Sequence, residues 1–269
     1  MEERIIPPSF GWEWIPKTWS LYQKYPLQLT ATFFVFYLIS AVCLLLPVIG
    51  HFVSGMLYPI LMLGAFKIFE DADLNRKPQV GDLFSAFSKN DSLKNILPVC
   101  LTSAVIMSTA GIITVILSQM MIKFKSDPVA VIPSAMMGVC VLIIIYAVLE
   151  MFKLFAPGFI YFRQMPGMKA MNASVVASLR NWRPFLVLTL VMLGLGVLYI
   201  VPLMFIGLTQ SLLGIKNNIF LVSVGAVEVL ALLFIAGPMY FSIPYFMFQE
   251  MLSGIKKPEL VETHQPSAS

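Results

Sequence analysis

The sequence contains few charged residues. Asp, Glu, Lys and Arg make up 12% of its 269 residues, about half of the roughly 25% found in soluble domains. Hydrophobic residues account for 58%, and the mean hydropathy is +0.84. Because this composition leaves long uncharged runs, it excludes an ordinary soluble domain and indicates a membrane protein. The net charge of +4 comes from Lys and Arg spread along the chain, so we expect no nucleic-acid partner.

The sequence also lacks the residue patterns of catalytic and cofactor sites. Its three cysteines lie in apolar runs, and no two of them stand at metal-ligand spacing. The two histidines, His51 and His264, have no Cys, Asp or Glu neighbour at ligand spacing. There is no nucleophile elbow, no phosphate-binding glycine loop and no pair of carboxylates placed for hydrolysis. We therefore predict a protein without catalytic residues, metal or cofactor.

Six apolar segments reach the roughly 20 residues that a membrane-spanning helix needs. They lie at about 27–49, 51–69, 96–119, 132–155, 184–209 and 219–247. No cleavable signal peptide is expected, because mostly polar and aromatic residues precede the first segment. Gly237, Pro238 and Pro244 predict a bend in the last one. The predicted fold is therefore all-α, a six-helix transmembrane bundle that forms one membrane domain over residues 1–255.

The charges between these segments predict the orientation. Fifteen of the 18 Lys and Arg residues lie in the N-terminal segment, the second and fourth loops or the tail. The other side of the membrane would hold only Lys123, Lys125 and Lys216. Because Lys and Arg concentrate on the cytoplasmic side, we expect both termini in the cytoplasm. The polar tail, residues 256–269, is expected to be disordered.

Three further segments predict helices that lie on the membrane surface. They cover residues 10–25, 80–90 and 168–183, and each leads directly into a span. In each, apolar residues recur with a helical period: Trp12, Ile15, Trp19 and Tyr22 in the first; Val80, Leu83, Phe84 and Phe87 in the second; Met168, Met171, Val175, Leu179 and Trp182 in the third. The predicted membrane-surface contacts are Trp12, Trp14, Trp19, Lys24, Phe84, Phe87, Lys89, Arg180, Trp182 and Arg183.

A surface helix followed by two spans would then occur three times. Short matches such as Ser20–Pro26 and Ser178–Pro184 open the first and third units, each with a small residue, an apolar one and a cation. Since every unit contains two spans, successive units enter the membrane in the same direction. We therefore predict three parallel repeats about an axis along the membrane normal, and not the inverted repeats of many transporters.

Acidic residues near the spans have different interpretations. Glu228 lies about ten residues into the sixth span, where a carboxylate costs at least a few kcal/mol unless it is protonated or paired. It is either a proton, cation or ligand site, or a neutral buried acid that donates to a neighbouring helix. Glu150 is expected to pair locally with Lys153. The cluster Lys67, Glu70, Asp71 and Asp73 is interpreted as the solvated end of the second span.

Several motifs near the first hairpin resemble a known group. They are Gly11–Ile15 leading into Trp19–Tyr22 and Pro26, Leu46–Gly50, and Tyr58–Gly64. Over residues 10–90 the chain resembles uncharacterised six-span bacterial inner-membrane proteins. These are similar to YciC-type proteins and to the membrane domain of some glycerophosphoryl diester phosphodiesterases. The resemblance implies a bacterial inner-membrane location and a six-helix fold. It carries no catalytic residues, because the phosphodiesterase domain is absent.

Together these features favour a non-enzymatic protein of the bacterial inner membrane. Its function would be to bind or handle a lipid-like or hydrophobic ligand, or to support a membrane complex, with membrane lipids and other membrane proteins as partners. The alternative is a small proton-coupled transporter or exporter that uses Glu228 as its coupling site. An intramembrane hydrolase would need Ser or His at an aqueous cavity, and the sequence does not indicate one.

Overall fold

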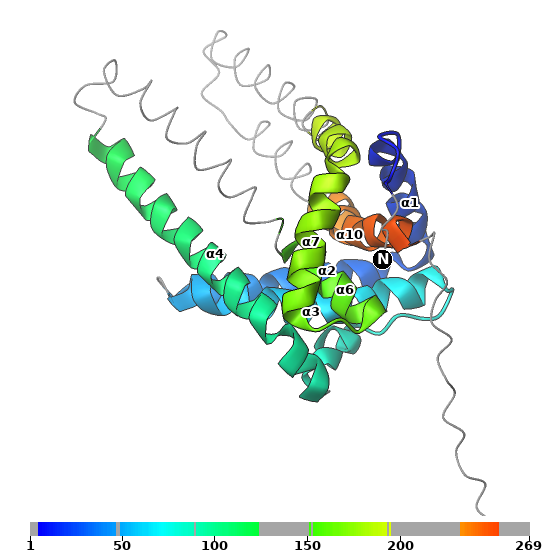
Figure 1. Ribbon diagram of the computed structural model, residues 1–269, viewed down its shortest axis with the longest axis horizontal. Coiled ribbons are helices and arrows are strands. Elements are labelled where there is room, and N and C mark those ends of the chain that lie inside the picture. Colours follow the sequence, from blue (N-terminus) through cyan, green and yellow to red (C-terminus); the bar gives the residue numbers. More distant parts are fainter. Residues whose placement is uncertain are drawn as a thin grey trace, which may run out of the picture.

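The computed structural model describes residues 5–46, 49–88, 90–123, 151, 153–192, 194 and 232–252, and this part of the chain is helical, without strands (Figure 1). Its helices are α1 (Phe10–Lys24), α2 (Pro26–Leu44), α3 (Ile49–Asp73), the 3₁₀ helix η1 (Val80–Ser88), α4 (Asn90–Lys123), α6 (Ala156–Arg163), α7 (Gly167–Arg180), a helix over Trp182–Met192, the π-helix η3 (Leu232–Ala236) and α10 (Gly237–Leu252).

Three of these helices have the length and apolarity to cross a membrane. They are Pro26–Leu44, Ile49–Asp73 and the Leu93–Ile113 part of α4. A fourth candidate is the pair formed by α7 and Trp182–Met192, which meet at an angle of 72°. Large apolar side chains of α2 and α4 face outward, with Leu38 63% and Val105 61% exposed. Apolar surface of this kind on long helices is typical of contact with lipid, so the chain has the features of a helical membrane protein.

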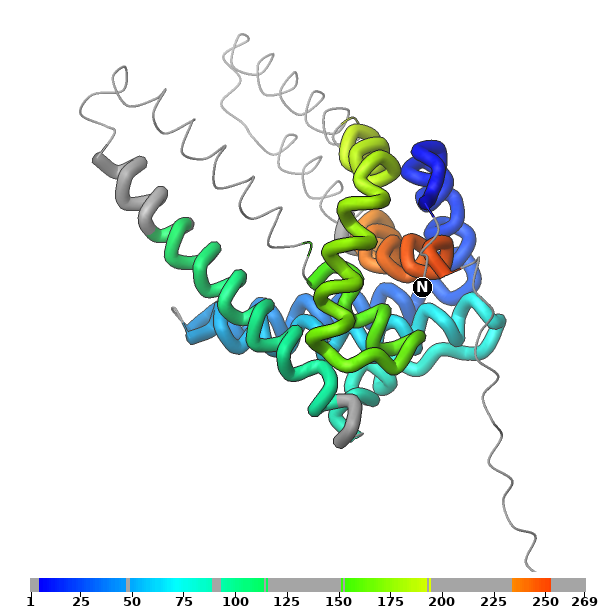
Figure 2. The backbone as a smooth tube through the Cα atoms, in the orientation of Figure 1, coloured from blue at the N-terminus to red at the C-terminus, as the bar shows by residue number. Residues whose placement is uncertain are grey.

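Helix α3 is the centre of the fold. It packs against α2, η1, α4, α6 and α10, and Figure 2 shows α2 alongside it and α4 crossing it. Two of its glycines permit close approaches to α4 and η1. A Cβ on Gly55 would lie 2.6 Å from the Ala104 Cα in α4, and one on Gly64 would lie 2.2 Å from the Leu83 carbonyl oxygen in η1. Small residues at such crossings are characteristic of helix packing in membranes.

The first predicted span is longer than the helix that the structure has there. Helix α2 ends at Leu44, whereas the apolar run predicted an end at residue 49. Pro47 accounts for the difference, because a proline disfavours the helical conformation in the residue before it. The Gly50 amide then donates to the Leu46 carbonyl at 2.9 Å, and α3 continues to Asp73, four residues beyond the predicted end.

The second predicted surface helix is a 3₁₀ helix instead of an α-helix. With three residues per turn, Leu83 and Ala86 lie on one face and are buried. Phe84 and Phe87 lie on another face and are exposed, with their ring centroids 6.5 Å apart. The predicted apolar stripe is therefore divided between the protein core and the outer surface.

The last predicted span contains the irregularity that its sequence indicates. The π-helix η3 ends at Ala236, and α10 begins at Gly237. Pro238 has no N–H to offer the carbonyl of Phe234 four residues earlier. That carbonyl instead accepts hydrogen bonds from the Tyr22 hydroxyl at 2.7 Å and the Thr30 hydroxyl at 3.2 Å. Side chains of α1 and α2 thus satisfy a backbone carbonyl that Pro238 leaves without its helical donor.

Parts of the fourth, fifth and sixth predicted spans lie outside the described residues, as does the tail 256–269. The described ends of these segments are helical: Ala156–Arg163 follows the fourth, Trp182–Met192 begins the fifth and Leu232–Leu252 ends the sixth. The six-span count and the three parallel repeats stay predictions.

Candidate functional site

Most of the predicted membrane-surface residues lie on the outside of the described structure. Trp12 is 59% exposed, and Trp19 and Trp182 are also exposed. Lys24, Phe84, Phe87, Arg180 and Arg183 are exposed as well. The guanidinium of Arg183 lies 5.7 Å from the ring centroid of Trp182, which is a cation–π contact. Lys89 and Glu228 lie outside the described residues.

Trp14 is the exception among these residues. Its side chain is 0% exposed, and its ring centroid lies 6.0 Å from that of Phe185. Gly11, one turn earlier, allows α1 to approach the helix Trp182–Met192, since a Cβ there would lie 2.4 Å from the Pro184 carbonyl oxygen. Trp14 therefore fixes α1 to the protein and does not contact the membrane surface.

Helix α7 buries a face of small side chains. Gly167, Ala170, Ser174 and Ala177 recur along it with a helical period. Met171, from the predicted apolar stripe, is also buried, whereas other members of that stripe are exposed. Most of the predicted apolar stripe is therefore exposed, and the side of α7 that packs on the protein carries small side chains instead.

Asn181 stands at the bend between α7 and the next helix. Its side-chain oxygen accepts from the Ile6 amide at 2.8 Å, and its side-chain nitrogen donates to the Ala177 carbonyl at 3.0 Å. The Asn181 side chain is fully buried. These two bonds fix the segment that precedes α1, at Ile6, to the bend between α7 and the helix Trp182–Met192.

The carboxylates at the C-terminal end of α3 form a bonded network. Lys67 pairs with Asp82 at 2.6 Å, and Arg76 pairs with Asp71 at 3.0 Å. The Tyr161 hydroxyl donates to Glu70 at 2.9 Å, and the Tyr245 hydroxyl donates to Asp73 at 3.1 Å. The interpretation of this cluster as a simple solvated helix end is wrong, because α6, η1 and α10 supply partners to it.

Lys153 also lies in a different environment from the one predicted. Its side chain is 5% exposed, and its ammonium lies 5.0 Å from the ring centroid of Tyr58 in α3. The expected pairing with Glu150 lies outside the described residues. A lysine held over an aromatic ring inside the protein is not placed to reach outward to lipid headgroups.

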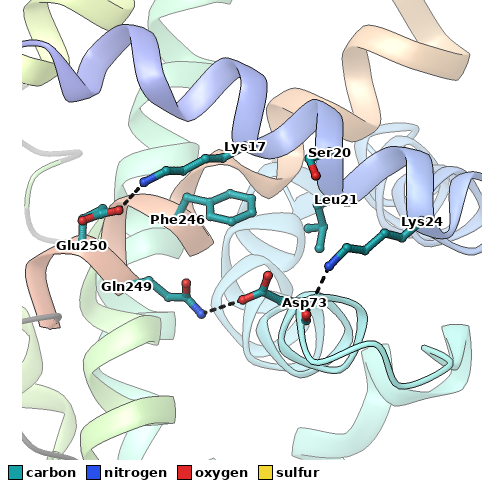
Figure 3. A pocket seen from close by; sticks show the side chains of 8 residues that line it. All are labelled: Lys17, Ser20, Leu21, Lys24, Asp73, Phe246, Gln249 and Glu250. Carbon is teal, nitrogen blue, oxygen red and sulfur yellow. Dashed lines mark hydrogen bonds and ion pairs between the residues drawn. The ribbon is translucent and has the colours of Figure 1, made fainter.

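Helices α1, α3 and α10 enclose a pocket of about 290 Å³ (Figure 3). The side chains that line it are Lys17, Ser20, Leu21, Lys24, Asp73, Phe246, Gln249 and Glu250. Lys17 forms an ion pair with Glu250, and the Gln249 amide donates to the Asp73 carboxylate at 3.3 Å. The Lys24 ammonium donates to the backbone carbonyl of Asp73, also at 3.3 Å. The pocket is thus lined by cations, carboxylates and an amide, together with the apolar side chains of Leu21 and Phe246.

Sequence reasoning missed this pocket because its walls come from opposite ends of the chain. Lys17 and Lys24 are seven residues apart in the sequence, so they lie on nearly the same side of α1. Tyr245 and Gln249 are four apart on α10 and face Asp73 together. Each spacing is visible in the sequence, but only the fold brings the two sets to one place.

Burial, followed by the charge of Glu70 and the hydrogen bond to it, raises the pKa of the Tyr161 phenol above its ordinary value of 10.0. A raised pKa means that the folded state disfavours the phenolate. The stabilisation from this bond is therefore fully present below pH 10.0 and is lost as the pH rises through the folded value.

We expect Tyr161→Phe to lower the free energy of unfolding by about 1.5 kcal/mol at neutral pH, the lower end for a hydrogen bond to a charged group. The variant should also lose less stability than the wild type above pH 10.0. Thermal unfolding in mild detergent across this pH range measures both effects. Tyr240→Phe, on the exposed part of α10, is the matched control. Equal alkaline profiles for wild type and Tyr161→Phe would contradict the assignment.

The described residues hold no group of three or more His, Cys, Asp or Glu side chains suited to a metal ion. No protein family, curated protein or solved structure matches the chain. The resemblance to YciC-type proteins therefore stays a prediction. The pocket can donate and accept hydrogen bonds and can pair with charges of either sign.

Proposed function

We propose that the chain is a non-enzymatic, multi-pass protein of a bacterial inner membrane that binds phospholipid. The observation that carries this proposal is the placement of exposed tryptophans and cations where short helices join long apolar ones. Trp19 and Lys24 lie in the last turns of α1, which leads into α2, and Trp182 and Arg183 begin the helix that follows α7. Tryptophan favours the membrane–water interface, and cations there attract lipid phosphates.

The orientation is part of the same proposal. With both termini in the cytoplasm, α1, η1 and α7 would lie at the cytoplasmic face, where anionic lipids attract basic side chains. The exposed Phe84 and Phe87 of η1 would insert into the same interface. The six-span bundle implied by the family resemblance would carry these helices around its cytoplasmic rim.

Native mass spectrometry of the protein released from mild detergent tests this function. We expect the full chain to retain one or more phospholipids at detergent concentrations that remove the bulk lipid. Added phospholipid should also raise the thermal unfolding temperature, since a ligand that binds only the folded state stabilises it. A lipid-free protein whose stability does not respond to added phospholipid would overturn the proposal.

A proton-coupled transporter is the second candidate, favoured by one specific observation. Glu228 lies six residues before Phe234 in the sequence, and Phe234 is part of the π-helix that ends at Ala236, directly before α10. Short π-helical segments next to α-helices occur frequently at functional sites. Proteoliposome flux that depends on pH and is lost in Glu228→Gln would support this function, and unchanged flux in that variant would remove Glu228 from it.

A further inference from the structure

The pocket between α1, α3 and α10 carries balanced charge. Lys17 and Lys24 face two carboxylates, those of Asp73 and Glu250, so the lining has no net charge. Lys17 and Glu250 already neutralise each other as an ion pair. A ligand with charge of one sign would be attracted by one half of the pocket and repelled by the other. A ligand that carries both signs complements the whole pocket.

The two remaining charges have uncharged partners. The Lys24 ammonium donates to a backbone carbonyl at 3.3 Å, a long hydrogen bond that neutralises none of its charge. The Asp73 carboxylate accepts from two neutral donors, the Tyr245 hydroxyl and the Gln249 amide. Figure 3 shows Lys24 and Gln249 converging on Asp73 from opposite sides of the pocket. A phosphate near Lys24 and an ammonium near Asp73 would each form a stronger, charge-assisted bond.

The floor of the pocket and its position suit a lipid. The Leu21 and Phe246 side chains are buried and apolar, and α1 also carries the exposed Trp19 that is expected at the membrane interface. The pocket would then lie at the depth of phospholipid headgroups. Its volume of about 290 Å³ is close to the lower limit of small-ligand sites, near 300 Å³.

We propose that this pocket binds the headgroup of an ammonium-bearing phospholipid, with the phosphodiester at Lys24 and a primary ammonium at Asp73. This inference rests on the proposed lipid-binding function and specifies its ligand. Phosphatidylethanolamine has this chemistry. Phosphatidylglycerol lacks the cation, and phosphatidylcholine has a cation without N–H donors for the carboxylates. Soluble glycerophosphoethanolamine has the same charged groups without the acyl chains.

The test is a titration of the full chain in mild detergent, read by native mass spectrometry. The three phospholipids are added with identical acyl chains, and glycerophosphoethanolamine is added in a separate arm. We expect phosphatidylethanolamine to bind about tenfold more tightly than either other lipid, the difference expected from one charge-assisted hydrogen bond. We expect glycerophosphoethanolamine to bind more weakly than the lipid. Tighter binding of the soluble compound would overturn the lipid assignment.

Two variants locate the binding in the pocket. Lys24→Gln should weaken phosphatidylethanolamine binding about tenfold, and Asp73→Asn should reduce the preference over phosphatidylcholine. Lys77→Gln is the matched control, because Lys77 is exposed in the loop after α3 and does not line the pocket. Equal binding of the three lipids, or unchanged binding in Lys24→Gln, would overturn this inference. Lipid retention without headgroup preference would leave the proposed function in place, whereas a protein that retains no lipid would overturn both.

Discussion

Trp14→Ala is expected to lower the free energy of unfolding by about 3–5 kcal/mol, the usual cost of deleting a buried aromatic side chain. Trp14 is fully buried, and its ring packs against Phe185. The substitution would leave a cavity between α1 and the helix Trp182–Met192, at the place where Gly11 brings their backbones close together. Thermal or denaturant unfolding in mild detergent, followed by tryptophan fluorescence and helical circular dichroism, measures the loss.

Trp12→Ala is the matched control for this prediction. The two residues are of the same type on the same helix, but Trp12 is exposed. An exposed substitution away from the core usually changes stability by less than about 0.5 kcal/mol. Trp12→Ala should instead weaken the association of α1 with lipid vesicles. Equal stability losses in the two variants would show that α1 is not packed with Trp14 inward.

Gly64→Ala is expected to lower the free energy of unfolding by about 1–3 kcal/mol through overpacking. The added Cβ would lie 2.2 Å from the Leu83 carbonyl oxygen and 2.6 Å from the Asp82 carbonyl oxygen. Both contacts are to the backbone of η1, so η1 would have to move away from α3. Alanine favours a helix over glycine by about 1 kcal/mol, so a net loss of stability would show that the cost of the contact exceeds this gain.

Gly81→Ala provides the comparison for Gly64→Ala. Gly81 belongs to η1 itself, and a Cβ there would meet nothing within 4 Å. We expect this variant to unfold at the wild-type temperature or slightly above it. Unfolding temperatures from fluorescence-detected size exclusion after heating are sufficient to rank the two. If Gly64→Ala proved as stable as Gly81→Ala, the close packing of η1 on α3 would be incorrect.

The sequence was sufficient to predict helices suited to a membrane, because a long apolar run in lipid must satisfy its backbone hydrogen bonds internally, and a helix does so. It also predicted a bend at Gly237, Pro238 and Pro244; the structure has a change from a π-helix to α10 at Gly237, and α10 continues through Pro244. It did not predict which face of α1 is buried. Both faces of such a helix can carry large apolar residues in a membrane protein. The residue type alone therefore does not tell that Trp14 is buried and Trp12 is exposed. Only the close approach permitted by Gly11 separates them.

The candidate site was harder to predict for a different reason. Glu70 and Asp73 end a helix among other charged residues, which in a single sequence has the pattern of a solvated terminus. Their hydrogen-bond partners Tyr161 and Tyr245 lie 91 and 172 residues away in the chain. Such pairings depend on which helices are neighbours, and hydrophobic periodicity carries no information about that.

The hydrogen bond from Tyr22 to the Phe234 carbonyl joins residues 212 positions apart, and Lys17 and Glu250 are joined over 233. Helix α1 therefore reaches these contacts only after α10 has been synthesised. The Trp14 side chain likewise packs against Phe185 only after residue 185 has been made. The packing of α1 is thus completed late in synthesis, and a substitution in α10 acts on the same late step.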